Sequence, residues 1–99
     1  MRIEVRGVGF AITDATRAHA HRKLLFALAQ QSSRMDRIVV RIVVVSDAEF
    51  ECRIIGTPRH GSPLVVTETD RDLNAAITRA ARRIGHTVSC SYARFRLAG

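Results

Sequence analysis

The sequence predicts an α+β fold, a two-layer sandwich in which two helices cover one face of a four-stranded sheet. Two observations support this fold. Short segments rich in Val and Ile, or alternating between apolar and polar residues, predict strands, whereas two long stretches without proline carry apolar residues at helical spacing. These segments follow the order β-α-β-β-β-α, without a repeat or a linker. The chain has 99 residues, of which 46% are hydrophobic, and this size is typical of one domain. We therefore expect residues 1–99 to form a single domain.

The first strand and the first helix have clear boundaries at their N-terminal ends. Residues 2–6 alternate, with Ile3 and Val5 on one side, and the glycines of 7–9 end the strand. Thr13 is typical of an N-cap, so we expect a helix over residues 14–31. Its apolar face would contain Ala20, Leu24, Ala27 and Leu28. Its opposite face would contain His19, Arg22, Lys23 and Phe26.

Three further strands are expected in the middle of the chain. They cover residues 37–45, 50–55 and 64–69, and their short connections predict an antiparallel meander. Residues 56–63 contain two glycines and two prolines, so this segment is predicted to be a loop.

The second helix is predicted to start near Asp70. Thr69 and Asp72 fit a capping box, and Asp70 itself is an alternative N-cap. Gly85 lies inside the helix and should weaken it by about 1 kcal/mol relative to Ala. The apolar face would contain Leu73, Ile77, Ala80, Ala81, Ile84 and Val88. The basic face would contain Arg79, Arg82, Arg83 and His86.

The charge balance indicates a nucleic-acid partner. Lys and Arg number 16 against 9 acidic residues, which gives a net charge of +7, and so basic a domain attracts polyanions. The N-terminus is too polar for a signal peptide, and no apolar run approaches the ~20 residues that span a bilayer. We therefore expect a cytoplasmic protein without a membrane partner, in which Cys52 and Cys90 are free thiols.

The sequence predicts neither an enzyme nor a cofactor. It contains no nucleophile elbow, phosphate-binding loop or paired-carboxylate pattern. His19, His21, His60 and His86 have no spacing to Cys or acids that indicates a metal site. The stripe from Arg79 to His86 could be a solvated helix face. No acid is interleaved four residues away in it, so we favour an RNA contact.

Five short motifs occur in an order and spacing that resemble a known family. They are Ile12-Thr13-Asp14-Ala15, Arg22-Lys23-Leu24, Asp36-Arg37-Ile38, Asp72-Leu73-Asn74-Ala75-Ala76-Ile77 and Arg83-Ile84. The family is that of ribosome hibernation-promoting factors, also called the ribosome-associated inhibitor or sigma-54 modulation family. The resemblance covers nearly the whole chain. Long-form members carry a C-terminal dimerisation domain, and this sequence ends before one could begin, so it resembles the short form.

The resemblance implies a fold similar to double-stranded-RNA-binding domains and a role as a ribosome-binding translation inhibitor. The partner would be the small ribosomal subunit, bound at the decoding region where mRNA and tRNA would sit. In the family, basic residues on both helices contact ribosomal RNA. By position, the implied RNA-binding residues are Arg22, Lys23, Arg79, Arg82, Arg83 and His86.

The sequence departs from the family pattern in the last helix, and these departures bear on the affinity for the ribosome. Members of the family usually carry a run of Lys and Arg in the last helix, but here residues 87–91 contain none. Basic residues return only at Arg94 and Arg96. Gly85 could also interrupt the helix. Two alternatives therefore stay open. One is a generic or degenerate RNA-binding module, and the other is a protein-interaction module that kept the fold but lost ribosome binding.

Two surface features also have alternative interpretations. Phe26 could stack on a base, meet a protein partner or be covered by the second helix. The outer sheet face would hold Val39, Val43, Val45, Ile55 and Val65, interrupted by Arg41 and Arg53. This face could form a weak homodimer, or its valines could be scattered residues that a strand tolerates.

Overall fold

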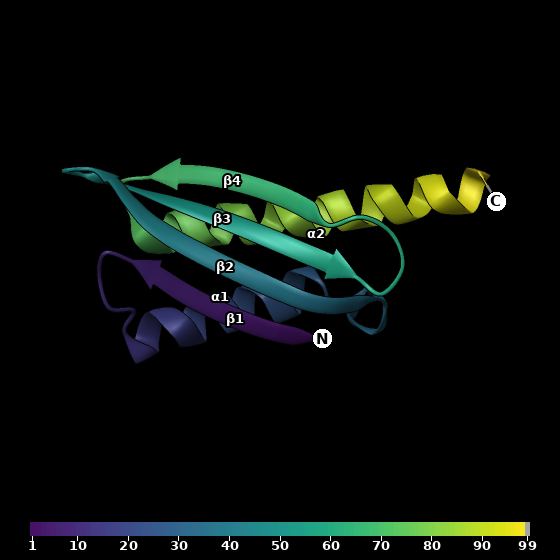
Figure 1. The fold of residues 1–99 in the computed structure, drawn as a ribbon, viewed down its shortest axis with the longest axis horizontal. Helices are drawn as coiled ribbons and strands as arrows, with labels where there is room; N and C mark the ends of the chain where they lie inside the picture. Colours follow the sequence, from purple (N-terminus) through teal and green to yellow (C-terminus); the bar gives the residue numbers. More distant parts are fainter. Residues whose placement is uncertain (99) are drawn as a thin grey trace.

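The computed structural model describes the backbone of residues 1–98 and the side chains of residues 1–91. Two helices pack on one face of a four-stranded sheet, which confirms the predicted α+β sandwich (Figure 1). The elements are β1 (Arg2–Val8), α1 (Asp14–Ala27), a 3-10 turn (Ser32–Arg34), β2 (Met35–Ser46), β3 (Glu49–Pro58), β4 (Leu64–Asp70) and α2 (Leu73–Ala98).

The sheet has the strand order β1-β2-β3-β4. Strands β2, β3 and β4 form the predicted antiparallel meander, with Ile54 paired to Val40 on one side and to Val66 on the other. Strand β1 lies at the edge and runs parallel to β2, with Val5 opposite Val40. Two adjacent parallel strands need a crossover connection, and α1 forms the one between β1 and β2.

The core lies between the sheet and the two helices, and both predicted apolar helix faces contribute to it. The buried helical residues are Ala20, Leu24, Leu28, Ala76, Ile77, Ala80, Ala81, Ile84 and Val88. Ala27 and Leu73 differ from the prediction because they are only half-buried. Each large aliphatic side chain removed from water contributes about 1.5–3 kcal/mol, so this interface is the main source of stability.

Helix α1 begins as predicted but ends early. The Thr13 hydroxyl accepts a hydrogen bond from the Thr16 backbone N–H at 3.1 Å, which confirms the N-cap. The predicted end at Gln31 is wrong, since the helix stops at Ala27. Leu28 is fully buried at this point, and the chain then turns to place Met35 in the core at the start of β2.

Strand β3 is longer than predicted, and the loop after it is correspondingly shorter. Gly56 to Pro58 belong to the strand rather than to a loop. A Cβ atom on Gly56 would lie 3.0 Å from Cε of Met35, so the missing side chain makes room for core packing. The glycine therefore reflects a close approach inside the sheet and not a chain break.

Helix α2 is capped by Asp72, so both predicted caps are wrong. Oδ1 of Asp72 accepts hydrogen bonds from the backbone N–H groups of Asn74 and Ala75 at 2.9 and 3.2 Å. Gly85 does not interrupt the helix, which continues to Ala98. The side chains of Arg94 and Arg96 lie outside the described residues.

The hairpin between β2 and β3 projects beyond the helices (Figure 1). Val44 lies at this end of β2 and is 47% exposed. The register shifts between Val44 and Ser46, and the hairpin end lies beyond the helical layer.

Among the described residues, no helix is long and apolar enough to cross a membrane.

Candidate functional site

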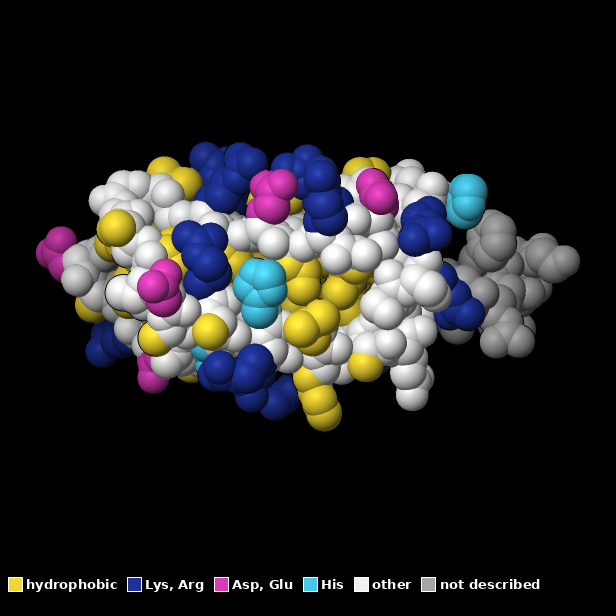
Figure 2. Space-filling model, turned by 90° about the horizontal axis from the view of Figure 1, so that it is seen from below, with side chains coloured by type: hydrophobic (Ala, Val, Ile, Leu, Met, Phe, Trp, Pro, Cys, Tyr) yellow, Lys and Arg dark blue, Asp and Glu magenta, His cyan; other side chains and the backbone are white. Residues whose placement is uncertain are grey.

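Basic side chains gather on two sides of the molecule. Seen from the edge formed by β1 and α1, Lys and Arg side chains lie along the sheet side and also on the helical side (Figure 2). The helical side contains the RNA-binding residues predicted from the sequence. On the sheet side, the pairing of β1 with β2 adds Arg6 to Arg41 and Arg53, which the sequence already placed on this face.

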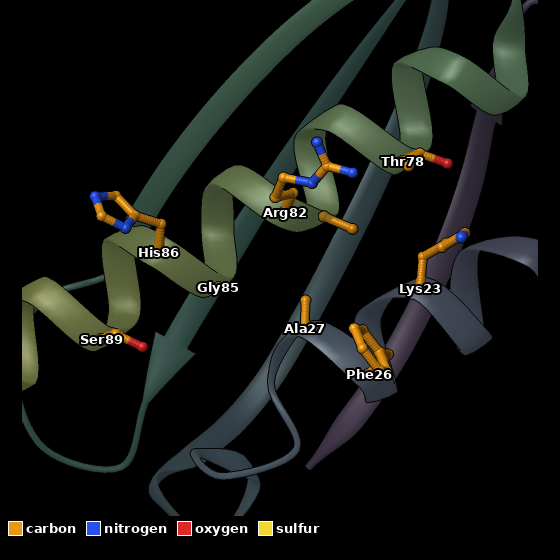
Figure 3. A pocket seen from close by; sticks show the side chains of 9 residues that line it. Lys23, Phe26, Ala27, Thr78, Arg82, Gly85, His86 and Ser89 are labelled. Carbon is orange, nitrogen blue, oxygen red and sulfur yellow. The ribbon is translucent and has the colours of Figure 1, made fainter.

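A groove of about 390 Å³ runs between α1 and α2 (Figure 3). Lys23 and Phe26 line it from α1, and Arg82 and His86 line it from α2. Lys23 and Arg82 are exposed, and neither has a hydrogen bond or ion pair with another described residue. Their charges are therefore available to an anion at the mouth of the groove.

The close approach of the two helices creates the floor of this groove. A Cβ atom on Gly85 would lie 2.8 Å from the carbonyl oxygen of Ala27, so only glycine permits this contact. Phe26 lies on the rim with 86% of its surface exposed, and the interpretation that α2 covers it is wrong. An exposed aromatic ring beside two cations is a suitable surface for stacking a nucleobase.

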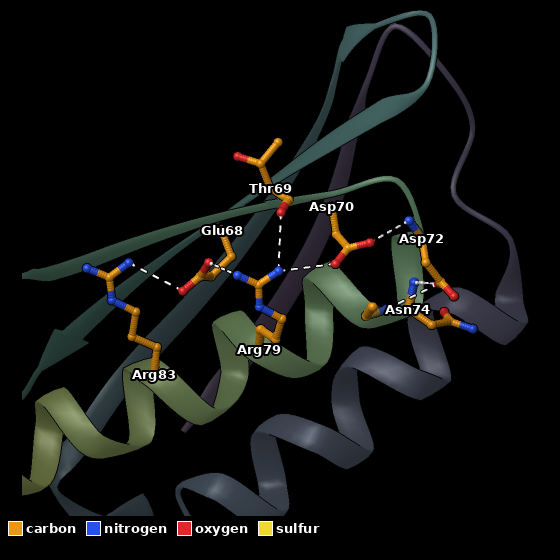
Figure 4. A network of polar contacts seen from close by, with 8 residues as sticks. Glu68, Thr69, Asp70, Asp72, Asn74, Arg79 and Arg83 are labelled. Carbon is orange, nitrogen blue, oxygen red and sulfur yellow. Dashed lines mark hydrogen bonds and ion pairs between the residues drawn. The ribbon is translucent and has the colours of Figure 1, made fainter.

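Arg79 and Arg83 stand in different surroundings because both reach back to β4 (Figure 4). Arg79 forms ion pairs with Glu68 at 3.0 Å and with Asp70 at 3.1 Å, and Arg83 pairs with Glu68 at 3.4 Å. The same helix supplies no acid to this stripe, as the sequence indicated, but β4 supplies two. The acids come from a neighbouring strand instead of the same helix.

The spacing of residues along β4 could have indicated these ion pairs from the sequence. Glu68 and Asp70 are spaced two and four residues after Val66, a core residue of the same strand, so they share its face. The pKa of Asp70 is lowered, first by the backbone N–H of Asp72 and then by the Arg79 guanidinium. Its carboxylate consequently stays charged and would repel a phosphate that approached Arg79.

The remaining predicted residues are distributed around the groove. Arg22 is exposed on α1 but does not line the groove. Nε2 of His86 lies 3.4 Å from Sγ of Cys90, one turn further along α2. His19 is half-buried rather than part of the outward face, because its Nε2 lies 3.1 Å from the Thr78 hydroxyl and 3.3 Å from the Asn74 carbonyl oxygen. His19 therefore links α1 to α2.

Metal binding finds no support in the described part of the chain. No group of three or more His, Cys, Asp or Glu side chains there could hold a metal ion. What the helical face offers chemically is two cations and an aromatic ring around one groove, an arrangement that suits anion and base binding.

Comparison with known proteins identifies relatives of the whole domain. Residues 3–89 match the family described as sigma 54 modulation protein / S30EA ribosomal protein. No curated protein matches the chain. The chain is similar to the N-terminal domain of protein Y from Thermus thermophilus, with 29% identity, a TM-score of 0.75, and coverage of 89% of this chain and 96% of that domain.

A second solved structure shows the same fold at lower identity. It is a ribosomal subunit interface protein from Coxiella burnetii, with 16% identity and a TM-score of 0.84. The match covers 94% of this chain and 99% of that protein. At this identity the likeness supports the fold alone.

Proposed function

Since this chain belongs to the sigma 54 modulation protein / S30EA ribosomal protein family, a family of ribosome-associated proteins, we propose that it binds the small ribosomal subunit and inhibits translation. The proposed site is the decoding region, where the protein would occupy the space of mRNA and tRNA. The mechanism is occupancy, in which no bond is made or broken.

The observation that carries this proposal is the groove between the two helices. Lys23 and Arg82 come from different helices and flank one groove without acidic partners among the described residues. Two cations on a packed helix pair can bind ribosomal RNA phosphates, and Phe26, which lines the same groove, can stack on an exposed base.

The six residues implied by the family resemblance are therefore ranked by their surroundings. Lys23 and Arg82 are proposed as the main RNA contacts, with Arg22 and His86 beside them. Arg79 and Arg83 are proposed as weaker contacts, because RNA would have to compete with Glu68 and Asp70 for their guanidinium groups.

The test is co-sedimentation of the protein with purified small subunits over a series of salt concentrations. Binding should fall steeply with salt, because phosphate contacts release counterions. The variant Lys23→Gln/Arg82→Gln should bind severalfold more weakly than the wild type, and mRNA with tRNA should displace the wild type. The matched control is Arg59→Gln/Arg71→Gln, which removes the same charge from two exposed residues in loops away from the groove.

Each other outcome has a definite meaning. Equal, weak binding to the subunit and to unrelated RNA would support the generic RNA-binding module and contradict the decoding-region proposal. No binding even at low salt would contradict both, and would leave the protein-interaction module. If both double variants lose affinity equally, net charge accounts for binding and the groove does not.

A further inference from the structure

The open face of the sheet carries a row of three arginines, one from each of three adjacent strands. Arg6 of β1 pairs in register with Arg41 of β2, and Arg41 pairs with Arg53 of β3. No helix covers this face, since both helices pack on the other side (Figure 1). Neighbouring strands lie about 4.8 Å apart, so the row extends about 10 Å across the sheet.

This row is poorly neutralised within the protein. Like charges directly opposite each other on adjacent strands destabilise a sheet. Glu4 pairs with Arg6 at 2.8 Å, but the same carboxylate oxygen also pairs with Arg37 at 2.9 Å. Among the described residues, neither Arg41 nor Arg53 has an ion-pair partner.

Arg41 and Arg53 also border a shallow hollow in the sheet surface. It has a volume of about 230 Å³, and Val43 and Glu51 complete its lining. Arg41 and Arg53 therefore line one concave site from neighbouring strands. Glu51 adds one negative charge to the lining, against two positive charges from the arginines, so the hollow has a net positive charge.

We infer that this arginine row binds the phosphodiester backbone of an RNA strand, on a face separate from the helical groove. Arginine presents a planar fork that suits phosphate oxygens, and a linear polyanion matches a linear row of cations. The row contains no aromatic side chain on which a base could stack, so it would contact phosphates without reading sequence. This inference goes beyond the proposed function, which concerns only the helices.

Two other occupants fit the surface less well. A second copy of this chain would bring a second face with Arg6, Arg41 and Arg53 against the first, and the like charges would repel. An acidic protein offers isolated carboxylates, whereas RNA offers charges at regular intervals along one chain. Both occupants are outcomes of the test below.

The experiment measures binding of a fluorescein-labelled 20-nucleotide polyuridine RNA by fluorescence anisotropy over a salt series. The variant Arg41→Gln/Arg53→Gln removes two phosphate contacts. Single-stranded nucleic acid loses about 0.7 in the slope of log K against log salt for each contact, so the slope should fall by about 1.4. The control Arg59→Gln/Arg71→Gln should leave the slope unchanged, and circular dichroism checks that each variant is folded.

The outcomes separate this inference from the proposed function. A sheet variant with the slope of the control would overturn the inference, whatever the Lys23→Gln/Arg82→Gln variant does on small subunits. Equal competition by a polyglutamate of matched charge would also overturn it, in favour of an acidic protein partner. A sheet variant with a reduced slope supports the inference, even if the helical groove proves not to bind ribosomes.

Discussion

Arg82 and Arg83 are adjacent in the chain and stand in different electrostatic surroundings. Arg82 lines the groove without a partner among the described residues, whereas Arg83 reaches the Glu68 carboxylate on β4. Exposed ion pairs contribute only about 0–1 kcal/mol to stability, so the pair with Glu68 matters more for binding than for folding. It places a negative charge where a phosphate would otherwise approach.

The two cysteines also differ at the scale of single residues. Burial raises the pKa of the Cys52 thiol to about 12, whereas Cys90 is partly exposed on α2. Because the thiolate is the nucleophile, roughly one Cys52 in ten thousand is reactive at pH 8 even before access is considered. We predict that an aromatic disulfide reagent modifies one thiol in the native protein and two in denaturant.

The thiol prediction has a direct control. The variant Cys90→Ser should leave no rapidly reacting thiol in the native state and one in denaturant. Two thiols that react equally fast in the native wild type would contradict the burial of Cys52.

At the scale of elements, the contact between α1 and α2 depends on Gly85. Alanine is about 1 kcal/mol better than glycine in a helix interior, and on local grounds a substitution there should stabilise α2. In the structure, however, the added Cβ would lie 2.8 Å from the Ala27 carbonyl oxygen and 3.1 Å from Cβ of Ala27. Both contacts involve atoms that can move only if a helix moves.

We therefore predict that Gly85→Ala destabilises the protein. Overpacking at a close contact costs about 1–3 kcal/mol, against a gain in helix propensity of about 1 kcal/mol, so we expect a net loss of up to about 2 kcal/mol. Urea unfolding monitored by circular dichroism measures the change in the free energy of unfolding. The control Ser91→Ala substitutes an exposed position of the same helix and should leave stability unchanged or slightly increased. A more stable Gly85→Ala variant would show that the helices do not meet at this position.

At the scale of the whole molecule, the two basic faces lie on opposite sides of one thin domain. The helical face carries the groove, and the sheet face carries the arginine row. A domain of this shape could contact two RNA segments at once. The weak homodimer that the sequence left open as one alternative for the sheet face would compete with one of these RNA segments for the same surface.

The two hypotheses for the sheet face predict different oligomeric states. If the arginine row dominates, the protein should remain monomeric at high micromolar concentration and low salt, because paired sheet faces would repel. Sedimentation equilibrium of the wild type and of Val43→Lys measures this directly. A wild-type dimer that Val43→Lys dissociates would support the homodimer and count against RNA binding by this face.

Local sequence patterns were sufficient to predict the order of the elements, the start of α1 and the family of this protein. The apolar periodicity predicted the order of the elements and the apolar faces of both helices, Thr13 identified the start of α1, and the motifs predicted the family. These features could be predicted because each depends on residues within a few positions of one another, where helix and strand geometry are known in advance.

Other features depend on which distant segments the fold brings together. The pairing of β1 with β2 sets Arg6 beside Arg41, and the packing of α2 against β4 joins Arg79 to Glu68. Glycine and proline had predicted a loop from Gly56, but Gly56 pairs with Ile38 of β2 and Leu64 of β4 and so belongs to the sheet. Strand register and helix packing are set by burial over the whole domain, so the charges available for binding could be assigned only from the tertiary structure.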